Sequence, residues 1–209
     1  MLILLTAYLS VLFFTITACD TLIDCPTSLE DRFKVIDLTV DFRSVIKDTV
    51  NDKLDLQISI FEEDSIDYES LGILLDYERV NYISEVVRPN HFNFIQTAYA
   101  CTPVEPTSDE AIDSIKIFSA QDFDKDHPAG TDLSDLFHLF YRDFSTYEYK
   151  QVDLDEFEPL SYNNIFNTTL MLKSAPELVQ EYSFLVKYYQ NGIDFDYFEK
   201  ETESIVIKD

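Results

Sequence analysis

Apolar and polar residues alternate along several stretches of this chain, with the period of two that is typical of a β-strand with one buried face. In residues 34–42 the alternation places four apolar side chains on one face: Ile36, Leu38, Val40 and Phe42. Residues 54–60 repeat the pattern. Runs rich in β-branched and aromatic residues predict further strands at residues 71–80, 92–101, 112–118 and 168–173.

The strongest local pattern lies near the end of the sequence. Apolar residues alternate from Tyr182 to Tyr188, and Asn191 and Gly192 follow shortly afterwards. Asn-Gly tolerates the positive φ that both central positions of a type I′ turn require, so we expect a hairpin turn of two residues there. The returning strand is expected to carry Ile193, Phe195 and Tyr197, and a last short strand to carry Ile205 and Ile207.

One segment of the body has helical spacing. Its apolar residues are spaced so that one face of a helix would bring them together: Leu133, Leu136, Phe137 and Phe140. Thr131 and Asp132 precede them and can cap a helix, so we expect a helix over residues 131–141. Residues 142–167 have no clear period and are expected to form short helices or a long crossover. Residues 101–111, which contain two prolines, are expected to form a loop.

These elements together predict an all-β fold. The strands are joined by short turns and do not alternate with helices, which excludes a parallel sheet of βαβ units. A single four-stranded sheet leaves too much apolar surface in water, so two antiparallel sheets are expected to pack face to face. We therefore expect an immunoglobulin-like two-sheet antiparallel sandwich with one or two short helices.

The first residues of the chain have a different composition. Residues 1–18 carry no charged side chain and form an apolar stretch that ends at Cys19. Its length suits a signal peptide, a retained membrane anchor or a buried helix. The four residues Ile16-Thr17-Ala18-Cys19 resemble the lipobox of bacterial lipoproteins, which implies cleavage before Cys19 and lipid attachment to it. The expected organisation is a signal peptide over residues 1–18, a tether over 19–32 and a single β-sandwich domain over 33–209.

Two cysteines remain once Cys19 is assigned to the lipid. Cys25 and Cys101 are an even pair in a chain that leaves the reducing cytosol, and such pairs form disulfides. A bond between them would close a long loop and fasten the tether to the body. The alternative is that Cys101 is a buried free thiol and Cys25 is unpaired.

Composition limits the function further. The chain has 15 Lys and Arg against 40 Asp and Glu, a formal net charge of −25, so nucleic acid is not an expected partner. Hydrophobic residues make up 46% of the chain, which is enough to build a core. Only three glycines are present, so the sequence lacks the glycine-rich loops of P-loop and dinucleotide-binding enzymes.

The sharpest candidate for a site is an acidic loop. Asp122, Asp124 and Asp126 alternate, and three carboxylates at such spacing can converge on Ca²⁺ when a loop curls. However, His127 replaces the glycine of an EF-hand-like loop and Leu133 replaces its bidentate glutamate. A polar turn in which the aspartates cap the backbone is therefore the preferred interpretation, and no metal site is assigned.

No catalytic residue or cofactor is predicted. The histidines His91, His127 and His138 lack the spacing of zinc ligands relative to each other or to cysteine. His138 lies in an apolar run, where a hydrogen-bonded core or boundary histidine is expected. Forty acidic residues also make any pair of carboxylates uninformative as a glycosidase signature.

A lipobox ahead of an acidic all-β body resembles the uncharacterised lipoproteins of Bacteroidota. Residues 114–137 and the closing hairpin, residues 182–207, also look like that group. The resemblance implies an outer-membrane location and no known activity. In such bacteria, Asp followed by Ser or Thr and an apolar residue accepts an O-glycan, and this pattern begins at Asp20, Asp48, Asp64 and Asp113.

We therefore expect a lipid-anchored, non-enzymatic interaction or accessory module on the outer membrane, with an unknown protein or glycan partner. The alternative is a hydrolase or a calcium-dependent glycan-binding protein whose site forms only in three dimensions. A purely structural envelope protein is a third interpretation.

Overall fold

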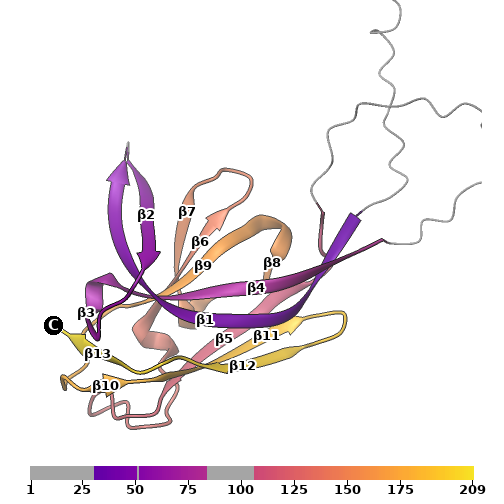
Figure 1. Ribbon diagram of the computed structural model, residues 1–209. Helices are drawn as coiled ribbons and strands as arrows, with labels where there is room; N and C mark the ends of the chain where they lie inside the picture. Colours follow the sequence, from indigo (N-terminus) through magenta and orange to yellow (C-terminus); the bar gives the residue numbers. More distant parts are fainter. Residues whose placement is uncertain (1–30, 51, 84–105) are drawn as a thin grey trace, which may run out of the picture. The chain divides into compact units, whose positions relative to one another are not determined.

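The strands predicted from the alternating pattern form a layered all-β body (Figure 1). The computed structural model describes residues 31–50, 52–83 and 106–209, without the side chains of residues 31, 83 and 166. These ranges form one compact unit, Asp31–Ile83 with Glu105–Asp209. Antiparallel sheets pack on each other, so the prediction of an all-β sandwich is confirmed. The short helices of the described residues are single 3₁₀ turns: η1 (Tyr68–Ser70), η2 (Ser134–Leu136), η3 (Leu154–Glu156) and η4 (Tyr162–Asn164).

One layer is a six-stranded antiparallel sheet in the order β2-β1-β4-β9-β6-β7. The expected strands at residues 34–42, 54–60, 71–80 and 168–173 all belong to it. Its members are β1 (Asp31–Val50), β2 (Lys53–Ile60), β4 (Leu71–Ile83), β6 (Phe137–Asp143), β7 (Tyr149–Asp153) and β9 (Ile165–Leu172).

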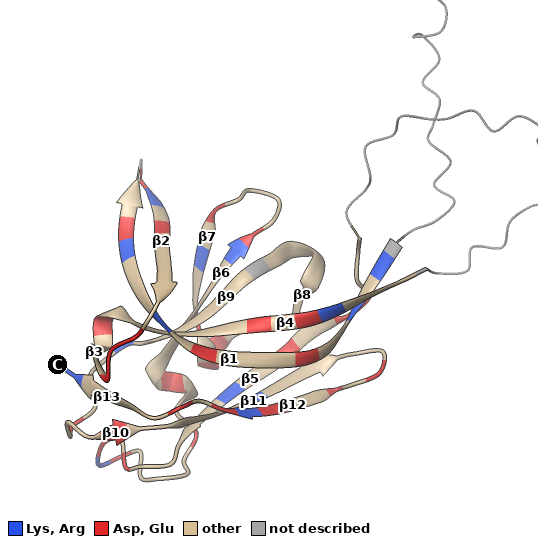
Figure 2. Cartoon of the chain, viewed as in Figure 1, with Lys and Arg blue, Asp and Glu red and all other residues tan. Residues whose placement is uncertain are grey.

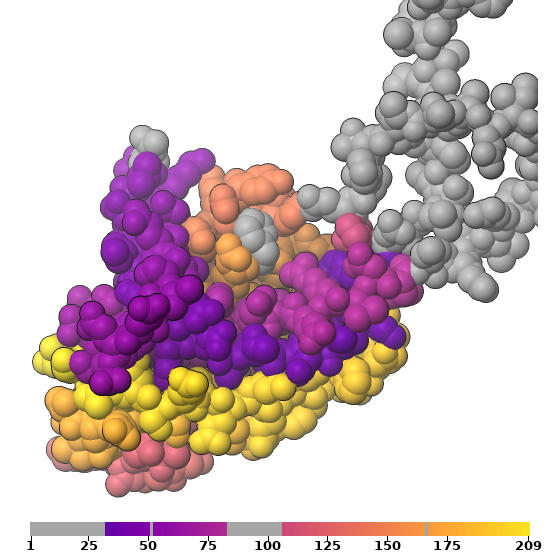
Figure 3. All heavy atoms as spheres, in the orientation of Figure 1, coloured from indigo at the N-terminus to yellow at the C-terminus, as the bar shows by residue number. Residues whose placement is uncertain are grey.

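The opposite layer consists of two smaller sheets. A four-stranded sheet has the order β12-β11-β5-β8, and a three-stranded sheet has the order β10-β13-β3, in which β13 and β3 run parallel. Figure 3 shows the C-terminal strands, in yellow, against β1, in indigo, where Lys200 pairs with Asp37 at 2.8 Å. The members are β3 (Ser65–Asp67), β5 (Ala111–Ser119), β8 (Leu160–Ser161), β10 (Glu181–Tyr182), β11 (Phe184–Asn191), β12 (Tyr197–Glu201) and β13 (Ile205–Lys208).

The main core fills the space between these layers. The alternation predicted for the last hairpin is observed, because Tyr182, Phe184, Val186 and Tyr188 are all fully buried. Ile73 and Leu75 of β4 face them from the six-stranded sheet. Complete burial of such a side chain contributes roughly 1.5–3 kcal/mol, so these rows hold the layers together.

The alternation of β1 changes phase at a bulge. The register with β4 shifts between Val35 and Asp37. Leu38 is fully buried as predicted, but before the bulge Val35 is the buried residue and Ile36 is only half-buried. The prediction that Ile36 lies on the same face as Leu38 is therefore wrong, because one extra residue in a strand reverses the face that its side chains occupy.

The six-stranded sheet curls enough to bring its two edge strands together. Lys53 of β2 and Glu148, next to β7, form an ion pair of 2.6 Å. A second core lies inside the curl, formed by Val45, Leu56, Phe140 and Met171. Strand β9 is thus buried on both faces, with Leu170 and Leu172 in the main core and Met171 in the second.

The predicted helix over residues 131–141 is wrong. The chain forms the single turn η2 and then strand β6, in which Phe137 and Leu139 face the main core and Phe140 faces the second. A strand buried on both faces has apolar residues at neighbouring positions, and such a run imitates the spacing of a helix.

The hairpin of β11 and β12 forms as predicted, but its turn is different. The last paired residues are Tyr189 and Tyr197, so Ile193 and Phe195 belong to the connecting loop and not to the returning strand. Gly192 does not adopt positive φ; a Cβ there would lie 1.9 Å from the carbonyl oxygen of Phe195. Glycine is therefore required by close backbone approach, and the prediction of a two-residue type I′ turn is wrong.

Several predictions concern residues outside the described ranges. They are the signal peptide, the tether up to residue 30, the strand at residues 92–101, lipid attachment at Cys19, the pairing of Cys25 and Cys101, and the role of His91. Of the expected loop at residues 101–111, the structure describes residues 106–111. Residues 106–110 have no regular structure apart from a bridge at Thr107, and Ala111 begins β5. No helix within the described ranges is long and apolar enough to span a membrane.

Candidate functional site

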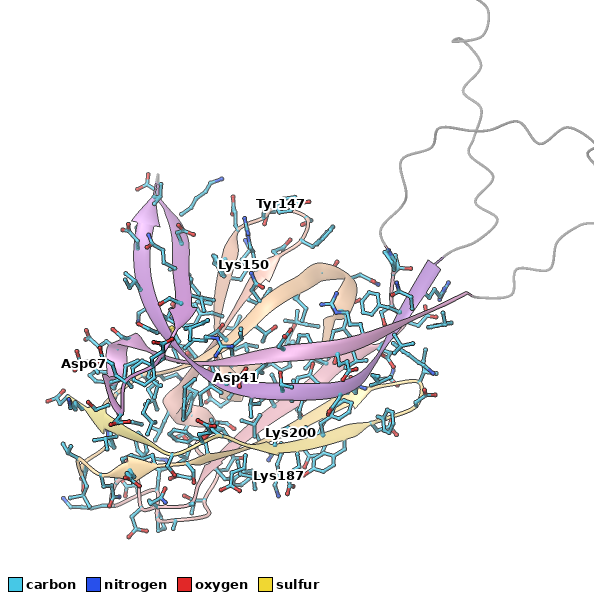
Figure 4. The ribbon with its side chains drawn as sticks, in the orientation of Figure 1. Asp41, Asp67, Tyr147, Lys150, Lys187 and Lys200 are labelled. Carbon is cyan, nitrogen blue, oxygen red and sulfur yellow. The ribbon has the colours of Figure 1, made fainter. Side chains whose placement is uncertain are left out.

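An acid-lined cavity of about 330 Å³ opens in the described part of the chain. It lies where the middle of β1 meets the turn between β2 and β3 and the segment between β12 and β13. Figure 2 shows the acidic run along the β2–β3 turn, and Figure 4 labels Asp41 on β1. The charged residues that line the cavity are Asp41, Arg43, Glu62, Glu63, Asp64 and Glu203.

The electrostatics of this cavity favour a cationic group. Its single guanidinium, Arg43, lies 3.1 Å from Asp41 and donates a hydrogen bond of 2.9 Å to the carbonyl oxygen of Phe42. The other four carboxylates line the remaining walls. Because they belong to exposed segments, water screens them strongly, and the cavity can attract a cation without holding it tightly.

Carboxylates of the candidate calcium loop accept hydrogen bonds from backbone N–H groups of the same loop. Asp122 accepts the backbone N–H of Ala129 at 2.7 Å, and Asp124 accepts those of Asp126 and His127 at 2.8 Å. Phe123, between them, is buried in the main core. Within the described residues, no group of three or more His, Cys, Asp or Glu side chains is arranged to hold a metal. Asp122 and Asp124 therefore act as caps of a tight loop, in which Asp126 contributes a backbone N–H.

His127 lies between two carboxylates of this loop. Its Nδ1 is 2.8 Å from Asp124 and its Nε2 is 3.2 Å from Asp135. Burial lowers the pKa of the His127 imidazole, but its contacts with Asp124 and Asp135 outweigh that effect and raise the pKa above its usual value of 6.5. The same contact helps to hold the pKa of Asp124 below its usual value, against the opposing effect of burial. The three side chains form a pH-sensitive clasp.

His138 is a boundary residue on β6, in agreement with the role expected from its apolar surroundings. Its Nδ1 lies 2.7 Å from Asp153 of β7, which also pairs with Lys173 at 3.2 Å. A carboxylate behind an imidazole can orient a general base. Here the ammonium group of Lys173 pairs with the same carboxylate, so Asp153 contacts both His138 of β6 and Lys173, which follows β9.

Two buried polar clusters are invisible in the sequence pattern. The hydroxyl of Tyr162 lies 2.7 Å from that of Tyr188 and donates to Gln190 at 2.6 Å. Burial raises the pKa of Tyr162 and Tyr188 and that of the neighbouring Tyr77, the last to about 12, so these three hydroxyls remain protonated.

The second cluster is centred on Glu110, which is 1% exposed. Its two carboxylate oxygens accept the backbone N–H of Val35 at 2.6 Å and of Ile193 at 2.8 Å. Glu110 thus joins β1 to the loop between β11 and β12. The sequence offers no signal for this role, because Glu110 lies in a loop and its partners are backbone groups distant in sequence.

Comparison of the chain with models of known families, with curated proteins and with solved structures found no match.

Proposed function

We propose that this chain is the precursor of a lipid-anchored protein of the bacterial outer membrane, whose β-sandwich is a non-enzymatic interaction or accessory module for a protein or glycan partner. The observation that carries the proposal is Ile16-Thr17-Ala18-Cys19, placed at the end of an uncharged apolar segment. Cleavage before Cys19 would make it the first residue of the mature chain and the point of lipid attachment. A single acyl chain binds a membrane only reversibly, so stable anchoring needs more than one.

The partners of the body's own ionisable groups support a binding role. Glu110 accepts hydrogen bonds from backbone amides. Asp124 and Asp135 contact the imidazole of His127, and the hydroxyl of Tyr162 is hydrogen-bonded within the core. Groups engaged in this way stabilise a rigid scaffold. The acidic surface, with a net charge of −25 for the whole chain, favours solubility and repels other anionic surfaces.

The anchor is tested by expressing the chain in a Bacteroidota host supplied with an alkyne-bearing fatty acid. Attachment of a fluorophore to the alkyne should label the protein, and Cys19→Ser should abolish the label and leave the precursor uncleaved. Cys25→Ser is the matched control, because it removes a nearby thiol without altering the lipobox. Equal labelling of the Cys19→Ser chain would refute the proposal.

The second candidate is a hydrolase or a calcium-dependent glycan-binding protein, and the acid-lined cavity is the observation in its favour. It is tested by retention of the protein on immobilised polysaccharides with and without calcium. Calcium-dependent retention that is lost when Glu63 and Asp64 are changed to Gln and Asn would favour this candidate over the first.

A further inference from the structure

The loop between β11 and β12 exposes apolar side chains at one end of the described body. Ile193 is 51% exposed, Phe195 46% and Tyr197, the first residue of β12, 41%. The Tyr197 ring lies 4.9 Å from that of Tyr189, centroid to centroid. Exposed apolar residues gathered in this way mark contact sites more often than isolated ones do.

The backbone of this loop is held firmly. The buried carboxylate of Glu110 accepts the N–H of Ile193 at 2.8 Å. Gln190 donates through its side-chain amide to the carbonyl oxygen of Phe195 at 2.6 Å and through its backbone N–H to that of Asp196 at 3.0 Å. Gly192 lies against the backbone of Phe195, so closely that a Cβ would not fit between them. The exposed side chains of Ile193 and Phe195 are thus attached to a backbone that these hydrogen bonds hold in place.

The loop lies at the end where β1 begins (Figure 1). Lys34 of β1 forms an ion pair with Asp194, and Val35 shares the carboxylate of Glu110 with Ile193. The chain between Cys19 and β1, residues 20–30, reaches at most about 40 Å when fully extended. A lipid on Cys19 would therefore hold the start of β1 within about 40 Å of the bilayer, and the exposed apolar loop lies beside that start.

We infer that the loop of Ile193 and Phe195 inserts into the interface of the bilayer and serves as a second membrane contact beside the lipid. This inference rests on the proposed anchor. Apolar area buried in the interface adds to membrane affinity, and aromatic side chains are favoured there. Lys34 compensates the charge of Asp194, and Asp194 and Asp196, on either side of Phe195, limit the contact to a shallow depth.

The chain contains no tryptophan, so one introduced indole reports on one position. Phe195→Trp is the probe, with Ile193→Trp as a second variant in case the first does not fold. Val179→Trp is the matched control. Val179 is also exposed, at 68%, but it lies just before β10, at the other end of the body from the β11–β12 loop (Figure 1). Each variant is acylated in the host and reconstituted into phosphatidylcholine vesicles, with and without brominated phosphatidylcholine.

Insertion predicts that the indole of the Phe195→Trp variant emits at shorter wavelength in vesicles. Brominated lipid should quench this emission roughly twofold, for a side chain within the outer 5–10 Å of the interface. The Val179→Trp variant should keep the emission of an indole in water. Equal quenching of the two variants, no quenching of Phe195→Trp, or an emission of Phe195→Trp that is already blue-shifted without vesicles would overturn the inference. The last result would mean that protein covers the loop.

A second arm separates this inference from the anchor itself. In the Cys19→Ser chain, a hexahistidine tag replaces residues 1–18 and binds vesicles that contain a nickel-chelating lipid. This tether supplies the proximity without acylation. Selective quenching of the Phe195→Trp indole in this arm supports the membrane contact even where Cys19 is not acylated, whereas its absence overturns the contact and leaves the anchor untouched.

Discussion

The buried carboxylate of Glu110 accepts the backbone N–H of Ile193, 83 residues further along the chain, at 2.8 Å. The other oxygen of the same carboxylate accepts the N–H of Val35 at 2.6 Å. One side chain therefore connects the first strand of the body with the loop of its last long hairpin.

Glu110→Ala is expected to destabilise the protein by about 3 kcal/mol, because the buried N–H of Val35 and the part-buried N–H of Ile193 lose a charged acceptor. Glu110→Gln should cost less, since its amide retains one acceptor oxygen. Glu158→Gln, at an exposed position, is the control and is expected to remain within about 0.5 kcal/mol of the wild type. Urea denaturation measures the three values. Equal stability of Glu110→Ala and the control would refute the structural role of this carboxylate.

Gly72 lies at a crowded point of the six-stranded sheet. A Cβ at this position would lie 2.4 Å from Cγ2 of Val45 and 2.9 Å from Cγ2 of Thr169. Gly72→Ala should therefore destabilise the protein by roughly 1–3 kcal/mol through overpacking. Adding Val45→Ala should recover part of that loss, so the double variant should be more stable than the sum of the single effects predicts. Strict additivity in thermal unfolding would contradict this account.

Gly130 provides a contrast, because its φ is +79° and a Cβ would meet no atom within 4 Å. Gly130→Ala is expected to cost about 1–2 kcal/mol from backbone strain alone. No substitution at a neighbouring side chain should recover this loss, whereas Gly130→Asn should lose less than Gly130→Ala. Both are measured by thermal unfolding under the conditions used for Gly72→Ala.

The clasp of His127 with Asp124 and Asp135 makes stability depend on pH. The pKa of His127 is raised in the folded state, so its contribution is fully present below about pH 6.5 and is lost as the pH rises through the folded-state pKa. The pKa of Asp124 is lowered, so its contribution is present above the unfolded value and is lost as the pH falls through the folded-state pKa. Stability from the pair is therefore greatest at mildly acidic pH.

The measurement compares wild type and His127→Asn by urea denaturation between about pH 5 and pH 9. The difference in unfolding free energy should be largest near the acidic end and shrink as the pH rises. A constant difference across this range would show that His127 contributes only by packing. His138→Asn is carried in parallel as the matched control for loss of a histidine elsewhere in the body.

The loop around Asp122 should be indifferent to calcium. Its carboxylates accept backbone N–H groups, a role that an amide oxygen also fills. We expect the thermal midpoint to be unchanged by calcium or by a chelator, and Asp122→Asn to be more stable than Asp122→Ala. A calcium-dependent rise of the midpoint that Asp122→Asn abolishes would instead indicate a metal site.

The sequence predicts this fold best where a strand has one buried and one exposed face. In β11, Phe184, Val186 and Tyr188 are buried alternately, and the pattern alone identifies the strand. For strand β6 the pattern alone does not identify a strand. Phe140 packs in a second core, which forms only because the sheet curls. Burial on both faces depends on which strands become neighbours, and local periodicity contains no information about that.

The candidate sites also differ in how well the sequence predicts them. The turn around Asp122 is foreseeable from short-range capping by aspartates. The acid-lined cavity and the carboxylate of Glu110 are not, since each combines residues far apart in sequence. The bulge of one residue between Val35 and Asp37 and the close approach at Gly192 likewise follow from pairing partners that local patterns do not specify.

The central claim is that Cys19 carries the lipid that attaches this body to a membrane. Its most direct test is the intact mass of the native protein, purified from a Bacteroidota host, before and after reduction. The account predicts the mass of a chain that begins at an acylated Cys19, with a gain of two hydrogen atoms on reduction if Cys25 and Cys101 are bonded. A mass that still includes residues 1–18 would contradict it, because the apolar segment would then be retained and Cys19 would not be the first residue.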